Sequence, residues 1–146
     1  MKCILLIVIY IVYLNSALAS NGCPEDWSYY GESCYAYVNF KETWTGAAEI
    51  CERFGGFLVE IDSSSENDFV KQLLRNSGAG SVWTGGNDLL RSRRWSWLFS
   101  GNRIKFTDWA PGEPHATSTE RCIQLWRDRS FSMGRWDLCC TTCLCV

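Results

Sequence analysis

Apolar residues change their spacing along the chain, and each change predicts a different element. Alternating apolar positions at 28–30 and 34–40, joined by Gly31-Glu32-Ser33, predict a β-hairpin. From Thr43 onward apolar residues recur every three or four positions, which is the spacing of an amphipathic helix. Gly55-Gly56 marks the end of this helix. The residues on its apolar side are Trp44, Ala47, Ala48, Cys51 and Phe54.

A second helix and then a series of short strands follow. The apolar residues at 57–61 predict a short strand, and Ser63 to Glu66 offer a capping box for a helix that stops at 76–78. The buried side of this helix comprises Phe69, Val70, Leu73 and Leu74. After Gly80 the apolar runs are short, rich in aromatic residues and separated by turn residues, at 81–83, 95–97, 106–109, 122–126 and 131–136. Two early helices followed by a small, irregular antiparallel β region predict an α+β domain.

The first 19 residues have the pattern of a secretory leader. Lys2 precedes an apolar run of 12 residues at 3–14, and Ala-Leu-Ala at 17–19 matches a processing site. The run is shorter than the ~20 apolar residues that cross a bilayer. We therefore expect residues 1–19 to be a cleaved signal peptide. Residues 20–146 would form one extracellular domain with no membrane span.

The charge balance and the residue inventory exclude several functions. Without Lys2 the chain has 13 basic and 16 acidic residues, which gives no electrostatic case for binding nucleic acid or anionic membranes. Arg91, Arg93 and Arg94 are interpreted as a solvated loop. The chain has one histidine, His115, and no G-x-S-x-G motif, so we expect no enzyme of the Ser-His-Asp type and no other enzyme activity. Most of the eight tryptophans are interpreted as core residues rather than as a sugar-stacking surface.

Cysteine usage indicates a disulfide framework. Eight cysteines remain after the loss of Cys3, and five of them fall in the last 25 residues. A bridge from Cys51 to this tail would close a loop of ~90 residues and stabilise the fold by ~4 kcal/mol. A thiolate zinc site in the tail is less favoured, because His115 is distant in sequence. An intermolecular bridge from a tail cysteine is a further alternative.

Several short motifs occur in a fixed order along the chain. The first half contains Cys-Pro-x-x-Trp at 23–27, Ser-Cys-Tyr at 33–35, Trp44 with Cys51, and Gly-Gly-x-Leu-Val-x-Ile at 55–61. The second half contains Trp-Thr-Gly-Gly-Asn-Asp at 83–88, Trp-Ser-Trp at 95–97, Phe-x-x-Trp-Ala-Pro-Gly-Glu-Pro at 106–114 and Glu-x-Cys at 120–122. Together these motifs resemble the C-type lectin domain family. The resemblance implies a C-type lectin-like fold of class α+β, with two helices, small antiparallel sheets, a long loop region and disulfide bonds.

The resemblance also implies a set of disulfides. In the family the cysteine of the first helix pairs with the last cysteine, here Cys51 with Cys145. A second pair joins the cysteine after the long loop to one beyond the Trp-Asn-Asp element, here Cys122 with Cys140. An early pair, Cys23 with Cys34, marks the longer form of the domain. Cys139 and Cys143 remain as an extra pair, and in the short tail Cys143 could replace Cys145 and Cys139 could replace Cys140.

Sugar-binding members of the family hold a calcium ion that also binds two sugar hydroxyls. The resemblance places its protein ligands at Glu113, Glu120 and Asp137, whose carboxylates suit a hard cation. It also implies a cis bond between Glu113 and Pro114. Two positions depart from the family pattern, because His115 replaces an asparagine and the asparagine expected before Asp137 is missing.

Three interpretations of His115 remain open. Imidazole suits zinc, copper or nickel better than calcium, so a mixed transition-metal site is one interpretation. In the second, His115 donates a hydrogen bond to a sugar while the carboxylates retain a weakened calcium site. In the third, His115 is an exposed loop residue of a site that has lost its ion. The family's accessory calcium site needs acids where Ser92 and Ala116 stand, which leaves Asp88 alone, so we expect that site to be absent.

From the resemblance we expect a secreted carbohydrate-binding lectin with a modified Glu-Pro-His site. Its partners would be glycans, and calcium would be a cofactor that the site has weakened or lost. Glu113 points to mannose-type sugars, and secreted single-domain members of the family point to innate defence. The alternative is a calcium-independent lectin-like module that binds a protein or a mineral or ice surface. Oligomerisation stays open, because lectins gain avidity from multivalency and the sequence contains no collagen-like or coiled-coil stalk.

Overall fold

The computed structural model describes residues 22–115, 119–136 and 141–146. The predicted signal peptide lies outside these ranges. The elements in chain order are β1 (Ser28–Tyr30), β2 (Ser33–Glu42), α2 (Trp44–Arg53), α3 (Ser64–Asn76), β3 (Val82–Asn87), β4 (Ser96–Trp97), β5 (Cys122–Trp126), the 3-10 helix η1 (Arg127–Arg129), β6 (Ser132–Trp136) and β7 (Thr141–Cys145). None of the described helices is long and apolar enough to cross a membrane.

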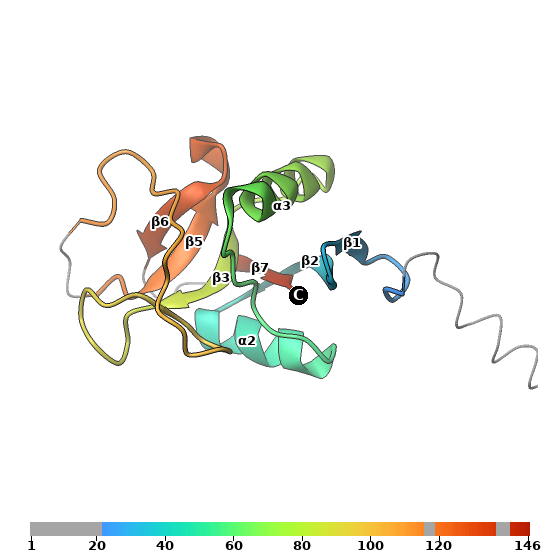
Figure 1. Ribbon diagram of the computed structural model, residues 1–146, viewed down its shortest axis with the longest axis horizontal. Helices are drawn as coiled ribbons and strands as arrows, with labels where there is room; N and C mark the ends of the chain where they lie inside the picture. Colours follow the sequence, from blue (N-terminus) through green and yellow to red (C-terminus); the bar gives the residue numbers. More distant parts are fainter. Residues whose placement is uncertain (1–21, 116–118, 137–140) are drawn as a thin grey trace, which may run out of the picture.

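The strands form one sheet in the order β1-β2-β7-β3-β5-β6, with β4 paired to β3. The pairing of β3 with β7 is parallel, and the other strand pairs are antiparallel. The α+β class with two helices is therefore confirmed, and the sheet is mixed rather than purely antiparallel. The helices lie on opposite sides of the strands, and β5 and β6 lie at the end of the sheet opposite the β1–β2 hairpin (Figure 1).

Both helices begin at the residues that the sequence predicts. The Thr43 side chain accepts a hydrogen bond from the backbone N–H of Gly46, and α2 follows directly. The Ser63 hydroxyl accepts from the N–H of Glu66 at 3.2 Å, which caps α3. Glu66 returns a contact to the N–H of Asp62 at 2.9 Å, one residue earlier than in the standard capping box.

Two predicted strands are wrong, for a topological reason. Residues 57–61 make a single bridge, between Leu58 and Cys145, and backbone hydrogen bonds to the end of β7. A longer ladder cannot form, because β2 and β3 already occupy both edges of β7. Residues 106–109 likewise make one bridge, between Trp109 and Met133. In contrast, the cysteine-rich tail forms β7, which sequence analysis did not identify as a strand.

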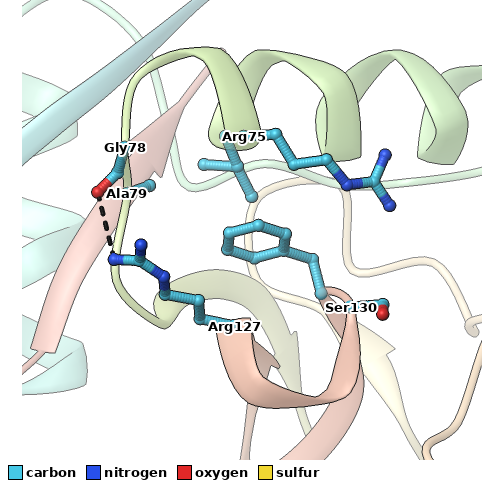
Figure 2. Close-up of a pocket in the computed structure, with 7 residues that line it drawn as sticks. Arg75, Gly78, Ala79, Arg127 and Ser130 are labelled. Atoms are coloured by element: carbon cyan, nitrogen blue, oxygen red, sulfur yellow. Dashed lines mark hydrogen bonds between the residues drawn. The ribbon is translucent and has the colours of Figure 1, made fainter.

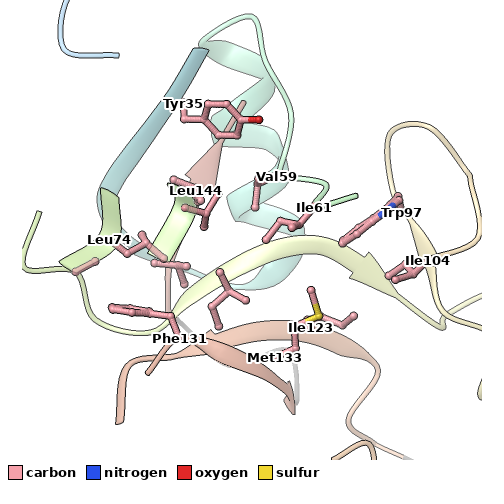
Figure 3. Packing of buried hydrophobic residues seen from close by; sticks show 14 residues of the cluster. Tyr35, Val59, Ile61, Leu74, Trp97, Ile104, Ile123, Phe131, Met133 and Leu144 are labelled. Carbon is pink, nitrogen blue, oxygen red and sulfur yellow. The ribbon is translucent and has the colours of Figure 1, made fainter. Parts of the chain in front are cut away.

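The apolar residues are divided between two buried clusters. The larger one lies between the sheet and α3 and includes Val59, Leu74, Ile123 and Leu144 (Figure 3). The smaller one lies under α2 and includes three residues with little or no exposure: Trp44, Cys51 and Trp83. The indole of Trp44 donates to the carbonyl of Thr84 at 2.8 Å. Trp44, Trp83 and Trp97 are buried, so the interpretation as core residues is confirmed for these three tryptophans.

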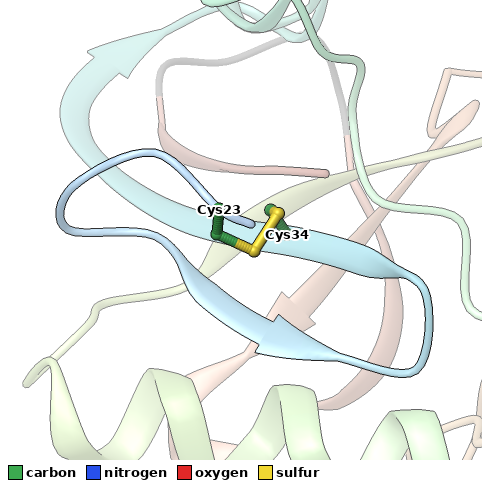
Figure 4. The surroundings of a disulfide bond; sticks show 2 residues. All are labelled: Cys23 and Cys34. Carbon is green, nitrogen blue, oxygen red and sulfur yellow. A yellow bond between two sulfur atoms is a disulfide. The ribbon is translucent and has the colours of Figure 1, made fainter. Parts of the chain in front are cut away.

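Two disulfides are present among the described residues. Cys23 and Cys34 join the N-terminal turn to β2 (Figure 4). Cys51 and Cys145 join α2 to β7. Both pairs are those that the family resemblance implied.

Two further cysteines, Cys122 and Cys143, are buried thiols in the structure. Their predicted partners, Cys140 and Cys139, lie outside the described residues, so these two pairings stay predictions. The sulfur of Cys143 lies within 4.8 Å of those of Cys51 and Cys145, although these two already form a disulfide and offer no thiolates to zinc. Burial raises the pKa of the Cys143 thiol to about 11, which keeps it protonated at neutral pH.

Candidate functional site

The long connection between β4 and β5 brings three of the predicted site residues together. Ala110 to Glu113 form a turn in which the N–H of Glu113 donates to the carbonyl of Ala110 at 2.9 Å. Gly112 has a φ of 90° in this turn, a conformation that favours glycine. The Glu113–Pro114 bond is cis, as the resemblance implied. The turn and the cis bond place Glu113 and His115 beside Glu120, which leads into β5.

The imidazole of His115 lies between two carboxylates. Its Nδ1 is 2.7 Å from Glu113 Oε1, and its Nε2 is 3.0 Å from Glu120 Oε2. Each ring nitrogen therefore lies within hydrogen-bond distance of a carboxylate oxygen. The His115 side chain is 48% exposed, whereas that of Glu113 is 5% exposed. The histidine therefore forms the outer surface of the cluster, and Glu113 forms its floor.

The donor set of this cluster does not match calcium. Calcium prefers six to eight oxygen ligands, whereas here imidazole nitrogens lie within hydrogen-bond distance of both carboxylates. The second Glu113 oxygen, Oε2, is buried and has no hydrogen-bond partner among the described residues. Such an unused buried acceptor is costly unless a donor reaches it. Asp137, the third predicted ligand, lies outside the described residues.

A buried arginine fixes the backbone of the same loop. The guanidinium of Arg135, on β6, donates from Nε to the carbonyl of Glu120 at 2.8 Å and from Nη2 to the same carbonyl. Its Nη1 donates to the carbonyl of His115. The guanidinium carbon also lies 5.3 Å from the centre of the Trp95 ring, within the range of a cation–π contact. Arg135 thus holds the residues on both sides of positions 116–118.

A second arginine binds Asp88, the one carboxylate that the resemblance left for an accessory calcium site. Asp88 is 1% exposed and accepts from Arg121 Nε at 2.6 Å and from the backbone N–H of Arg93 at 2.7 Å. Arg121 Nη2 also donates to the Asp88 carbonyl. Burial raises the pKa of the neighbouring Cys122 thiol to about 12. The negative charge of Asp88 adds to this increase, and the positive charge of Arg121 opposes it.

Sequence analysis did not identify Arg121 and Arg135 as site residues. Both are adjacent to recognised motif residues, because Arg121 lies between Glu120 and Cys122 and Arg135 precedes Trp136. Their partners are backbone carbonyls and a carboxylate 15 to 33 residues away in the sequence. Spacing of residue types does not reveal such contacts.

A separate hollow lies between the end of α3 and η1, with a volume of about 240 Å³. Leu74 and Phe131 are among its lining residues, together with Arg75 from α3 and Arg127 from η1 (Figure 2). Arg127 Nη1 donates to the carbonyl of Gly78 at 3.3 Å, so its guanidinium group joins η1 to the end of α3. We assign no function to this hollow.

The family model for the lectin C-type domain matches residues 40–146, and the chain belongs to this family. Its curated relatives include lithostathine-1 of Mus musculus, 33% identical over 120 residues that cover 80% of this chain and 72% of the relative. A perlucin-like protein of Mytilus galloprovincialis is 28% identical over 94% of this chain and 90% of the relative.

Solved structures give the same family assignment. A structure of human lithostathine superposes with a TM-score of 0.80 at 28% identity, covering 87% of this chain and 91% of that one. A calcium-independent type II antifreeze protein superposes with a TM-score of 0.76 at 26% identity, covering 84% and 93%. The family thus includes proteins with different ligands, and the site residues must indicate the ligand of this chain.

Proposed function

We propose that this protein is a secreted lectin that binds glycans at the Glu113-Pro114-His115 loop and does not require calcium. The observation that supports the proposal is the imidazole of His115 between the carboxylates of Glu113 and Glu120. In that position an imidazole ring, rather than a divalent ion, would lie between the two carboxylates and present its nitrogens to a sugar. The site would act by binding, without catalysis.

The cluster has the groups that a sugar needs. Carboxylate oxygens accept hydrogen bonds from sugar hydroxyls, and an imidazole N–H donates to them. Glu113 Oε2 has no hydrogen-bond partner among the described residues, so a sugar hydroxyl that reached it would satisfy a buried acceptor. Glu113 at this position favours mannose-type over galactose-type sugars by family resemblance. Secretion follows from the predicted signal peptide, and host defence is the role that the resemblance favours.

Affinity chromatography on immobilised mannan tests the proposal. We expect the protein to bind in the presence of a calcium chelator and to elute with free mannose. His115→Asn should lower binding in the chelator at least tenfold and should restore a dependence on calcium. Glu52→Gln, an exposed change on α2, is the control and should bind like the wild type.

The experiment separates the two parts of the proposal. Elution of the wild type by chelator alone would contradict the calcium-free mechanism while leaving sugar binding intact. Retention that free mannose and free galactose both fail to reverse would contradict sugar binding at this loop.

A second candidate function is adsorption to an ice or mineral surface. It is favoured by the fold match to a calcium-independent type II antifreeze protein and by the similarity to a perlucin-like protein. A thermal-hysteresis measurement and a calcium carbonate adsorption assay test it. Activity in either assay that survives His115→Asn would favour this candidate over glycan binding.

A further inference from the structure

Basic residues are concentrated in one part of a chain that is acidic overall. The full sequence has 14 basic and 16 acidic residues. Between Asp88 and Asp108, however, it contains no acidic residue and five basic ones, Arg91, Arg93, Arg94, Arg103 and Lys105. All five are exposed. Because charges beyond about 8–10 Å are screened at physiological salt, this local excess determines what the surface attracts, and the net charge does not.

The tip of this region combines the charges with exposed apolar side chains. Leu90 is 92% exposed and Leu89 is 44% exposed. They directly precede Arg91, and the arginines at 91, 93 and 94 make no ion pair with an acidic side chain in the described part of the chain. We name residues 89–94 the Leu-Arg tip. Exposed leucines beside three exposed arginines supply the two groups, apolar and basic, that bind a protein to an anionic lipid surface.

The backbone of the Leu-Arg tip is tied down on both sides. The N–H of Leu89 donates to the Asn87 side chain at 3.3 Å, and the N–H of Arg93 donates to the Asp88 carboxylate at 2.7 Å. The N–H of Arg94 donates to the carbonyl of Arg91 at 3.0 Å, which closes a turn. The leucines are therefore presented by a fixed turn, which lowers the entropy lost when they enter another medium.

We propose that the Leu-Arg tip binds anionic phospholipid membranes. The arginines would contact lipid phosphates and carboxylates, and Leu90 would enter the boundary between headgroups and acyl chains. Leucine distinguishes this partner from a sulfated polysaccharide, which offers charge without an apolar phase. The tip follows Asp88, whose partner Arg121 adjoins Glu120 of the candidate glycan site. A membrane bound at the tip would therefore lie near that site.

Vesicle sedimentation with sugar-free lipids tests this proposal independently of the proposed lectin function. Phosphatidylcholine vesicles are compared with vesicles containing one third phosphatidylserine, both in a calcium chelator. We expect binding to the anionic vesicles alone and weaker binding at high salt. Arg91→Gln with Arg94→Gln should lower the partition coefficient about 25-fold, and Leu90→Ser should lower it about tenfold.

The matched control is the pair Phe40→Ser and Arg53→Gln, which removes an exposed apolar and an exposed basic side chain on β2 and α2. It should bind like the wild type. Circular dichroism and thermal unfolding confirm that each variant is folded. The proposal is overturned if the tip variants and the control bind equally. It is also overturned if the wild type binds heparin but no vesicles, which would assign the tip to a sulfated polysaccharide.

Discussion

Two regions of this domain are held together by different chemistry. Around β7 the chain is fixed by fully buried apolar residues such as Leu144 and by the Cys51–Cys145 disulfide. Between β3 and β6 the loop region is fixed by arginines, of which Arg121 binds the Asp88 carboxylate and Arg135 binds two backbone carbonyls. In this loop region cationic side chains, rather than apolar contacts, hold the oxygen atoms in place.

The difference has a consequence for how each region responds to substitution. Apolar packing is non-directional, so a core position accepts changes that conserve volume. A guanidinium that serves several oxygens at fixed angles has no equivalent replacement, because lysine offers a point charge without the planar fork. We therefore expect the core to control global stability and the arginines to control the order of the loop. The following experiments test this division, beginning with the largest effect.

Removal of the Cys51–Cys145 disulfide should have the largest effect. The bond spans 94 residues of sequence, against 11 for Cys23–Cys34. In the chain-entropy model these separations correspond to roughly 4–5 and roughly 3 kcal/mol. We expect the double variant Cys51→Ser with Cys145→Ser to lose about 2 kcal/mol more than Cys23→Ser with Cys34→Ser in urea unfolding. Equal losses would show that the long-range bond does not dominate the core.

Breaking the Asp88–Arg121 pair should rank second. Arg121→Met leaves a carboxylate that is 1% exposed without its cation, and such a loss costs about 3 kcal/mol. Adding Asp88→Asn removes the unpaired charge and should recover part of the loss, as measured by a double-mutant cycle in urea. Arg53→Met, an exposed change, serves as the control. Additive losses from the two single changes would refute the coupling.

Arg135→Lys should have a smaller effect on stability and a specific effect on the loop. Lysine keeps the charge but cannot reach the carbonyls of His115 and Glu120 together, so we expect a loss of about 1–2 kcal/mol. Hydrogen exchange should rise at 113–121 and remain unchanged in β5. A uniform rise over the whole sheet would mean that Arg135 supports the core instead of the loop.

The smallest effect concerns Asp108. This residue lies in the long connection between β4 and β5 and joins it to α3 through Asn67 and Lys71. Burial alone would raise the pKa of this carboxyl, but hydrogen bonds from Lys71 and Asn67 outweigh it and hold the pKa below its usual value. Because the folded-state pKa is the lower one, the contribution is complete above the unfolded value of about 3.9 and is lost as pH falls through the folded pKa.

Asp108→Asn should therefore cost less than ~1 kcal/mol at pH 7, since the side chain is one third exposed and screened by solvent. The difference from the wild type should disappear in strong acid. Thermal unfolding between pH 2 and pH 7 measures it. A difference that persists unchanged at pH 2 would assign the effect to packing.

Local features of the fold could be predicted from the sequence, and long-range features could not. The helix with Trp44 and Cys51 follows from spacing, and the start of α3 at Ser64 follows from the Ser63 cap, whose bond reaches only three residues along the chain. Residues 57–61 have the composition of a strand, but the neighbours of β7 determine that they do not form one. Composition cannot report which edges of a strand are already occupied.

In the candidate site, too, local features could be predicted from the sequence and long-range contacts could not. The resemblance located Glu113, Glu120 and the cis bond before Pro114. The resemblance left three interpretations of His115 open, because the role of an imidazole depends on which side chains the fold brings next to its ring. The structure places the ring between Glu113 and Glu120. The fixing of the loop by Arg135 required knowledge of contacts across the sheet.

The position of β7 in the sheet also constrains when the domain can fold. β7 is the last strand to be synthesised, yet it lies between β2 and β3 and joins the two halves of the sheet. A growing chain that has not reached Thr141 can form the β1–β2 hairpin and the helices, but β2 and β3 then lack the strand that joins them. Completion of the sheet, and with it the Cys51–Cys145 bond, must therefore follow the synthesis of β7.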